Sequence, residues 1–295
     1  MTRKCCLVAI IGEPNAGKST LTNLMVGEKI SIVSNKVQTT RRLIKGISVI
    51  DETQIVFIDS PGFGKANSSL EKALRKNFRC SYNDADVVLM IIDASARNYS
   101  ASIDFIQKFR KNPKQIFAVA INKVDIANKE NLLKIADILS KYSDIKEIFM
   151  ISALKNDGVD SLRQFICCCA HVGNWIFPGG VVTDLNMQLR LADITREKLF
   201  GALVKELPYC IYVETELVKY SLKKATIYQA IVVMKNSQKG IIIGKDALMI
   251  KRIKFFAIKD MALLLDKKID LKIFVKVKEK WPDKTSHLLN AGIVD

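Results

Sequence analysis

The chain has 295 residues and carries a formal net charge of +16, with a pI near 9.5. This length suffices for two domains of ordinary size, and no apolar run reaches the roughly 18 residues that predict a membrane-spanning helix. The 7 cysteines form no C-x-x-C pair and lack the spacing of a disulfide framework, which argues against a secreted disulfide scaffold and against a metal site built from cysteine. We expect a cytoplasmic protein, because residues 1–4 lead directly into a strand-like run and leave no room for a signal peptide. We also expect the protein to be a monomer.

Alternating strand and helix patterns fill the first part of the chain. Runs typical of buried strands cover residues 5–11, 42–50, 54–59, 87–93, 115–122 and 147–152, and helical patterns cover 21–26, 102–111, 130–142 and 159–171. The second and third runs flank a short polar turn and predict a hairpin. The alternation predicts an α/β fold: a mostly parallel sheet with helices on both faces and a ligand site at the carboxyl ends of the strands.

The periodic pattern stops at residues 173–184, where Pro178, Gly179 and Gly180 mark a turn. Beyond this stretch the sequence predicts a helix at 185–207, strands at 209–217 and 227–234, a turn at 240–244, a basic helix at 248–265 and a strand at 269–277. We therefore divide the chain into a first domain at 1–172, a linker at 173–184 and a smaller α+β domain at 185–295.

Residues 12–20, Gly-Glu-Pro-Asn-Ala-Gly-Lys-Ser-Thr, fit the phosphate-loop pattern G-x-x-x-x-G-K-[ST] and lie between a predicted strand and a predicted helix. The two glycines let consecutive N–H groups turn toward a phosphate at the N-terminus of the helix. Lys18 is expected to contact the β- and γ-phosphates, and the Ser19 hydroxyl is expected to bind Mg²⁺. The predicted nucleotide contacts in this loop are Gly12, Glu13, Pro14, Asn15, Ala16, Gly17, Lys18, Ser19 and Thr20.

Two further loops have the composition of switches that sense the γ-phosphate. In the loop 59–62, Asp59 would orient Mg²⁺ through a water, and the Gly62 N–H would meet the γ-phosphate. The loop 38–41, Gln-Thr-Thr-Arg, offers the hydroxyl that completes the Mg²⁺ shell, and we favour Thr40 over Thr39. Because both loops would touch only the γ-phosphate and its metal, hydrolysis would release them.

A third loop predicts which base is bound. Residues 122–125, Asn-Lys-Val-Asp, fit the N-K-x-D pattern, in which the carboxylate accepts hydrogen bonds from guanine N1–H and the 2-amino group. Adenine offers neither donor in that geometry, so the pattern predicts GTP and GDP. Residues 152–154 end the next strand and can present a backbone N–H to guanine O6. Outside the phosphate loop, the predicted nucleotide contacts are Asp59, Ser60, Pro61, Gly62, Phe63, Asn122, Lys123, Val124, Asp125, Ser152, Ala153 and Leu154.

Phe63 stands where Ras-like switches carry the glutamine that orients the attacking water. A phenyl ring cannot do this, so we expect slow intrinsic hydrolysis, on the order of 10⁻⁴ to 10⁻³ s⁻¹. The Asn15 side-chain oxygen is a candidate ligand for a monovalent cation such as K⁺, placed where an arginine finger would otherwise supply positive charge. The expected catalytic residues are Lys18, Asn15 and Thr40, and the expected Mg²⁺ ligands are Ser19, Thr40 and Asp59.

Taken together, these motifs resemble the Era family of bacterial GTPases, and the resemblance covers essentially the full length. The four motifs at 12–19, 38–41, 59–62 and 122–125 indicate a translation-factor-like GTPase, whereas ITREK at 194–198, ELPY at 206–209 and FVKVK at 274–278 are specific to Era. The resemblance implies a GTPase domain followed by a type II KH domain, which binds the 3′ end of small-subunit (16S) ribosomal RNA and acts in assembly of the 30S subunit. It also implies peripheral association with the inner membrane.

KH domains grip the backbone of about four nucleotides with a G-x-x-G loop, and the corresponding residues here are Gly-Lys-Asp-Ala at 244–247. The second glycine is replaced and an acidic residue lies inside the loop, so both departures are expected to weaken RNA binding. Surrounding basic residues still supply charge for phosphates. The predicted RNA contacts are Lys239, Gly244, Lys245, Ala247, Lys251, Arg252 and Lys254.

Much of the C-terminal surplus of basic residues lies at 235–280, and a solvated lysine-rich face would have the same composition. Three functions therefore remain open from the sequence. One is a GTP-hydrolysing switch whose nucleotide state controls docking of an RNA-binding domain. Another is an RNA-binding assembly factor that holds GTP without useful turnover, which the missing glutamine at position 63 favours. The third is a membrane-surface signalling GTPase that uses the basic segment on anionic lipid.

Overall fold

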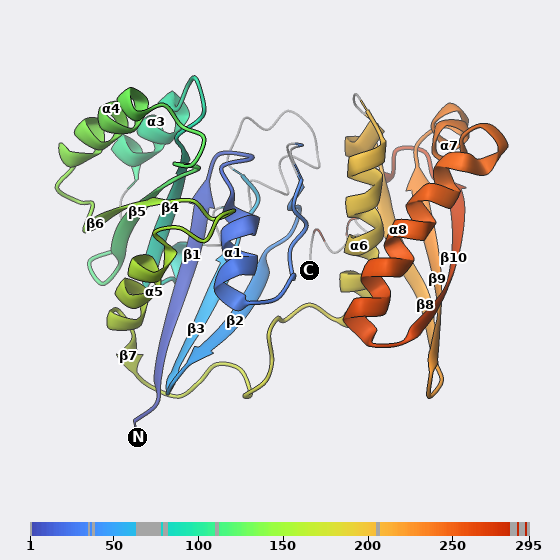
Figure 1. Ribbon diagram of the computed structural model, residues 1–295, viewed down its shortest axis with the longest axis horizontal. Helices are drawn as coiled ribbons and strands as arrows, with labels where there is room; N and C mark the ends of the chain where they lie inside the picture. The colour runs from blue at the N-terminus through green and yellow to red at the C-terminus, as the bar shows by residue number, and fades with distance from the viewer. Residues whose placement is uncertain are drawn as a thin grey trace. The chain divides into compact units, whose positions relative to one another are not determined.

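The computed structural model describes residues 2–34, 36, 39–62, 78, 82–109, 112–204, 207–283, 288 and 293. Gln38, Phe63 and Glu206, which the sequence analysis singled out, lie outside these residues. The described chain forms two compact units that divide between Asp184 and Leu185 (Figure 1). Within the described ranges, no helix is long and apolar enough to cross a membrane.

The first unit is built on a sheet that has seven strands in the described residues, in the order β2-β3-β1-β4-β5-β6, with β7 beside the start of β1. Its parallel strands are β1 (Lys4–Gly12), β3 (Thr53–Asp59), β4 (Val87–Asp93), β5 (Ile116–Asn122) and β6 (Glu147–Ile151). Two strands are antiparallel to their neighbours: β2 (Ile44–Ile50) to β3, and β7 (His171–Val172) to β1. The predicted hairpin is therefore β2-β3, at one edge of the sheet.

Helices cover both faces of this sheet, as the alternating pattern predicts. On one face, α1 (Lys18–Val26) and α5 (Val159–Cys168) pack against β1 and β3 through residues such as Leu21 and Leu162. On the other face, α3 (Ser100–Lys108) and α4 (Lys129–Ser140) pack Ile106 and Ile135 against β4 and β5. Central strands are buried on both sides in such a layered fold, which explains their continuous apolar runs.

The register of the strands brings the predicted loops to one edge of the sheet. Ile10 pairs with Asp59, Asp93 with Asn122, and Asn122 with Ile151. Parallel strands therefore end at nearly the same level, and the loops that follow β1, β3, β5 and β6 emerge side by side. This edge is where ligands bind in open α/β sheets.

The second unit has a sheet of three strands in the described residues, in the order β10-β9-β8. β8 (Tyr212–Tyr220) and β9 (Lys224–Val233) are antiparallel, whereas β9 and β10 (Lys268–Val277) are parallel. The parallel pair is connected through α7 (Asn236–Ile243) and α8 (Leu248–Leu265), and α6 (Met187–Ala202) precedes β8. Apolar residues of these helices pack against the strands in two buried clusters.

Some predicted boundaries in the second unit are wrong. Residues 240–244 were expected to form a turn, but residues 240–243 complete α7, because Ile242 is fully buried against the sheet and its packing outweighs the low helix propensity of Gly240. The helix expected at 185–207 ends at Ala202, and a short 3₁₀ helix, Leu207–Cys210, occupies the expected start of β8.

Candidate nucleotide-binding site

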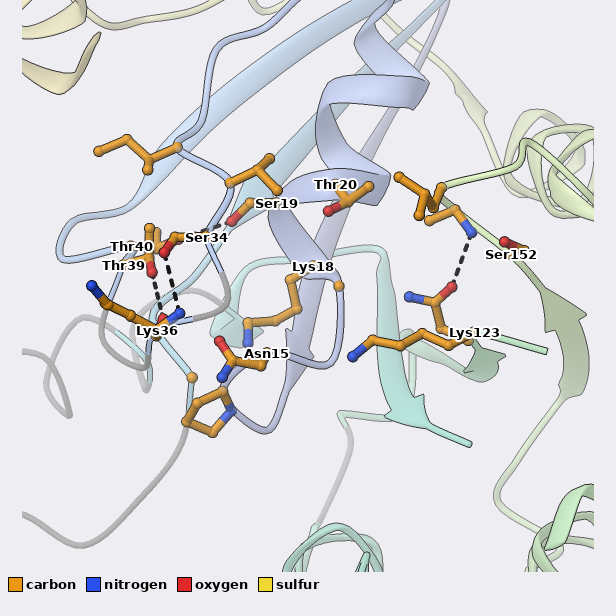
Figure 2. A pocket seen from close by; sticks show the side chains of 18 of the residues that line it. Asn15, Lys18, Ser19, Thr20, Ser34, Lys36, Thr39, Thr40, Lys123 and Ser152 are labelled. Atoms are coloured by element: carbon orange, nitrogen blue, oxygen red, sulfur yellow. Dashed lines mark hydrogen bonds between the residues drawn. The ribbon is translucent and has the colours of Figure 1, made fainter. Parts of the chain in front are cut away.

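A cleft of about 440 Å³ opens at the carboxyl edge of the first sheet (Figure 2). Most of the predicted nucleotide contacts line it: Pro14, Asn15, Gly17, Lys18, Ser19, Thr20, Thr40, Gly62, Asn122, Lys123, Asp125, Ser152, Ala153 and Leu154. The cleft is also lined by residues that the sequence analysis missed: Ile32, Val33, Ser34, Lys36 and Ile126. Most of these belong to the segment between α1 and β2, which has no motif to mark it.

The phosphate loop is wrapped around the Lys18 side chain. Lys18 Nζ donates hydrogen bonds to the backbone oxygens of Gly12 (3.0 Å) and Glu13 (2.8 Å). Gly17 has a φ of 100°, and a Cβ there would lie 2.2 Å from Asn122 Nδ2, so only glycine fits. α1 begins at Lys18, and the N–H groups of its first turn therefore point toward the cleft.

Burial shifts the pKa values of two charged groups at this loop, Lys18 and Asp59. The Lys18 side chain is almost fully buried, and burial lowers its pKa to about 8, although the charges of Asp59 and Glu13 oppose the shift. Burial raises the pKa of Asp59, while a hydrogen bond from Ser19 and the charge of Lys18 act against it. The cleft therefore has one buried amine and one buried carboxyl group side by side, and perturbed pKa values of this kind are typical of functional sites.

Three oxygen-bearing side chains meet at the foot of the cleft. Ser19 Oγ donates to Asp59 Oδ2 over 2.7 Å and lies 2.9 Å from Thr40 Oγ1. Asp59 Oδ1 is buried and has no hydrogen-bond partner in the part of the chain that the structure describes. Thr39 Oγ1 instead donates to the backbone oxygen of Lys36 over 2.6 Å. Hydroxyl and carboxylate oxygens suit Mg²⁺, so Ser19, Thr40 and Asp59 fit this metal.

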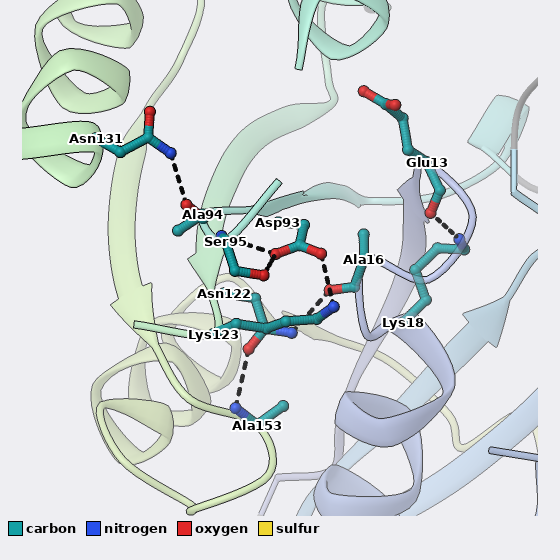
Figure 3. A network of polar contacts seen from close by, with 10 residues as sticks. All are labelled: Glu13, Ala16, Lys18, Asp93, Ala94, Ser95, Asn122, Lys123, Asn131 and Ala153. Carbon is teal, nitrogen blue, oxygen red and sulfur yellow. Dashed lines mark hydrogen bonds and ion pairs between the residues drawn. The ribbon is translucent and has the colours of Figure 1, made fainter. Parts of the chain in front are cut away.

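Asn122 ties the base-recognition loops to the phosphate loop (Figure 3). Its Nδ2 donates to the Ala16 backbone oxygen over 2.8 Å, and its Oδ1 accepts from the Ala153 N–H over 3.0 Å. The neighbouring Lys123 Nζ pairs with Asp93 Oδ2 over 2.6 Å. Asp93 was not predicted, although its place at the end of β4, directly beside the end of β5, was a signal for it.

In the loop after β6, the backbone N–H groups of Ser152 and Ala153 donate hydrogen bonds within the protein. The Ser152 N–H donates to the Asp157 backbone oxygen over 2.9 Å, and the Ala153 N–H donates to Asn122. The structure shows no acceptor among the described residues for the Leu154 N–H, and Leu154 lines the cleft. The Asp125 side chain is exposed and also lines the cleft.

Several residues that were predicted to contact the nucleotide have side chains that lie outside the cleft. The Glu13 carboxylate turns to the start of α3, where its Oε1 accepts from the Ser102 N–H (3.0 Å) and hydroxyl (2.5 Å). Glu13 therefore contacts Lys18 through its backbone oxygen and not through its side chain. Ser60 Oγ donates to the Ile10 backbone oxygen over 2.8 Å. Neither Ser60 nor Pro61 nor Val124 lines the cleft.

The predicted RNA contacts gather around one loop of the second unit. Between α7 and α8, Asp246 and Ala247 have φ values of 51° and 58°, in the left-handed region. Lys245, Lys251 and Arg252 are exposed beside them, whereas Lys239 and Lys254 are half-buried. Lys251 Nζ lies 3.3 Å from the Asp246 backbone oxygen, so one cation caps the loop from the first turn of α8.

Comparison with known proteins identifies both units. Residues 7–123 match the model of the 50S ribosome-binding GTPase family, and residues 206–282 match the KH domain model. The chain is 40% identical over 289 residues to GTPase Era of Sinorhizobium medicae, covering 97% of this chain and 92% of that protein. The chain belongs to the Era GTPase family. GTPase Era of Rickettsia bellii is 39% identical over 287 residues, which cover 97% of this chain and 96% of that protein.

Solved Era structures agree with this fold. A crystal structure of Era in complex with MgGDPNP and nucleotides 1506–1542 of 16S ribosomal RNA matches with a TM-score of 0.92 at 34% identity, covering 99% of this chain and 100% of that chain. An Aquifex aeolicus Era variant bound to GDP and AlF4⁻ matches with a TM-score of 0.93, again at 34% identity and with the same coverage. The prediction of an Era-family GTPase, with a mostly parallel P-loop domain followed by a KH domain, is confirmed.

Proposed function

We propose that this chain is a GTP-hydrolysing switch that binds small-subunit ribosomal RNA near its 3′ end and assists assembly of the 30S subunit. The GTP-binding domain would span residues 1–172, the linker 173–184 and the KH domain 185–295. The observation that carries the proposal is that Lys18, Ser19, Thr40 and Asp125 line one cleft, with the buried Asp59 bonded to Ser19 beneath it. The RNA partner is supported by the Era relative whose crystal structure contains nucleotides 1506–1542 of 16S ribosomal RNA.

The phosphates would be held by backbone N–H groups of residues 12–20 and by the Lys18 amine. Ser19 and Thr40 would ligate Mg²⁺ directly, and Asp59 would hold a metal-bound water through its buried Oδ1. Bound Mg²⁺ supplies positive charge to the β- and γ-phosphate oxygens. Asp125 would accept from guanine N1–H and the 2-amino group, and the Leu154 N–H would donate to guanine O6.

The Asn15 side-chain oxygen would bind the K⁺ ion. Its φ of 64° is left-handed, and Figure 2 shows its side chain in the cleft beside Lys18. A cation held there by the Asn15 oxygen would lie near the phosphates, where negative charge develops during hydrolysis. This supports K⁺ as an additional cofactor and offers a source of positive charge for a family member without the switch glutamine.

The exposed cations Lys245, Lys251 and Arg252 would contact RNA phosphates around the loop between α7 and α8. We place the protein in the cytoplasm with the 30S subunit as its partner. The same basic surface supports peripheral association with anionic lipid at the inner membrane.

The decisive experiment measures phosphate release from GTP with and without a 16S 3′-end oligonucleotide, in K⁺ and in Na⁺, with Lys18→Ala as the inactive control. We expect turnover that rises with RNA and K⁺ and is lost in the control. GTP binding without turnover in all conditions would favour the assembly factor that only holds GTP. Cosedimentation with anionic vesicles but not with RNA would favour the membrane-surface GTPase.

A further inference from the structure

Residues 173–184, here called the connecting segment, lie along the β2-β3 hairpin rather than away from it. The contact is centred on Gln54 of β3, which is fully buried. Gln54 Oε1 accepts hydrogen bonds from the Ile176 N–H (2.8 Å) and the Phe177 N–H (2.9 Å), and Gln54 Nε2 donates to the Phe177 backbone oxygen over 2.8 Å. The Gln54 side chain therefore makes the hydrogen bonds that a neighbouring strand would otherwise make with the backbone of Ile176 and Phe177.

The rest of the segment continues the contact along the outer edge of β2. The Ile47 N–H donates to the Val182 oxygen over 2.9 Å, and the Lys45 N–H donates to Asp184 Oδ1 over 3.0 Å. Near the turn of the hairpin, Trp175 Nε1 donates to the Glu52 oxygen over 3.1 Å. The connecting segment thus follows the hairpin from its turn to the start of β2.

The same hairpin joins the two loops that are expected to sense the γ-phosphate. β2 begins at Ile44, shortly after Thr40, and β3 ends at Asp59, which accepts from Ser19. Ile44 and Asp59 are paired in register. At roughly 3.3 Å per residue, Gln54 lies about 17 Å along β3 from Asp59. The strands to which the connecting segment is bonded are therefore continuous with both of these loops.

The chemistry of Gln54 favours a role in this contact over simple core packing. The four residues that follow it in β3, residues 55–58, are apolar and buried, and a buried amide is costly unless its polar atoms are paired. All the hydrogen bonds that the structure gives the Gln54 side chain go to Ile176 and Phe177.

We propose that Gln54 is the positioning residue through which the nucleotide state of the GTP-binding domain reaches the KH domain. Gln54 fixes the connecting segment to the hairpin between the two switch loops, and Leu185 follows this segment directly into the second unit. The inference rests on the proposed function, because it concerns how GTP would control RNA docking.

The test uses the full chain and compares Gln54→Leu, which keeps the bulk but removes the amide, with Gln115→Leu. Gln115 is a matched control: it is also buried, and its Nε2 donates to the backbone oxygens of Tyr82, Asn83 and Ala85, far along the chain from the connecting segment. The affinity for a 16S 3′-end oligonucleotide is measured with GDP and with GDPNP. The ratio of the two dissociation constants is the coupling factor.

In the wild type and in Gln115→Leu we expect a coupling factor of at least about 5, the lower end of common allosteric effects. In Gln54→Leu it should fall to within about twofold of 1, while GDP affinity stays unchanged. Retention of the wild-type factor in Gln54→Leu, or a wild-type factor of 1, would overturn the inference. Asp184→Ala, an exposed change at the other end of the contact, replaces Gln54→Leu if that variant does not fold and should lower the factor in the same direction.

Hydrogen exchange gives a readout that does not depend on RNA. The amides of Ile176 and Phe177 should exchange at different rates in the GDP and GDPNP states of the wild type, and rapidly in both states of Gln54→Leu. Equal exchange in the two wild-type states would overturn the inference. Absence of RNA binding in every state, combined with state-dependent exchange, would instead contradict the proposed function and leave the Gln54 contact supported.

Discussion

Lys18 makes nucleotide binding sensitive to pH in a way that can be worked out from its surroundings. Its amine contacts two backbone oxygens, and burial lowers its pKa from 10.5 to about 8. Phosphate oxygens would bring negative charge to Nζ and favour the protonated amine, so the pKa of Lys18 rises when nucleotide binds. Binding must therefore take up a proton whenever the amine is neutral beforehand.

The size of the effect follows from the protonated fraction. With a pKa of about 8, the neutral fraction of Lys18 is about 0.1 at pH 7 and about 0.8 at pH 8.5. The dissociation constant of GDP is proportional to one plus the ratio of neutral to charged amine, so it should rise about fourfold over this interval. Because burial lowers the Lys18 pKa to about 8, the amine loses its proton as the pH rises through this value, and GDP binding weakens.

Calorimetry measures this directly in the protein freed of nucleotide. Titrations with GDP in two buffers of different ionisation enthalpy give the number of protons taken up, which should rise from about 0.1 to about 0.8 between pH 7 and pH 8.5. Lys18→Arg serves as a control, because a guanidinium stays protonated throughout and any remaining uptake belongs to other groups. Uptake that stays near zero at both pH values in the wild type would refute the argument and return the Lys18 pKa to its ordinary range.

Further predictions concern the base, the cation and the RNA loop. Asp125→Asn should shift preference from GTP toward xanthosine triphosphate by about 1 to 3 kcal/mol, because an amide can donate to the xanthine 2-oxo group; an unchanged preference in competition binding would place base recognition elsewhere. K⁺ should raise GTP turnover well above Na⁺, and Asn15→Ala should remove the difference; equal wild-type rates in the two salts would contradict the role of Asn15. Asp246→Gly should tighten RNA binding measured by fluorescence anisotropy, because Asp246 costs roughly 2 kcal/mol by repulsion of a phosphate about 8 Å away, and this gain should shrink with salt. Ala247 is already left-handed in the protein without RNA, so Ala247→Gly should stabilise the fold by about 1 kcal/mol and leave the RNA affinity unchanged. An Asp246→Gly affinity equal to that of the wild type would mean that this loop does not hold the RNA.

The order of strands and helices in the first unit was predictable because its signals are local. A parallel strand that is buried on both faces must be apolar throughout, and a glycine-lysine loop between a strand and a helix has few other uses. α7 was missed for the opposite reason. Its sequence contains Gly240 and a short apolar run, and only the burial of Ile242 against the second sheet makes this segment helical.

The sequence by itself determined which chemical groups this protein brings to a guanine nucleotide, because each motif records a requirement of the backbone or of the ligand at one place in the chain. It left undecided how these groups are oriented. Thr39 and Thr40 have the same hydroxyl, and only the fold turns one to Lys36 and the other to Ser19. Gln54 directly follows the polar turn at 51–53 and shows no sign of its role in the sequence, since its partners lie more than 120 residues away. Such contacts depend on strand register and on the path of the returning chain, and these are properties of the tertiary structure alone.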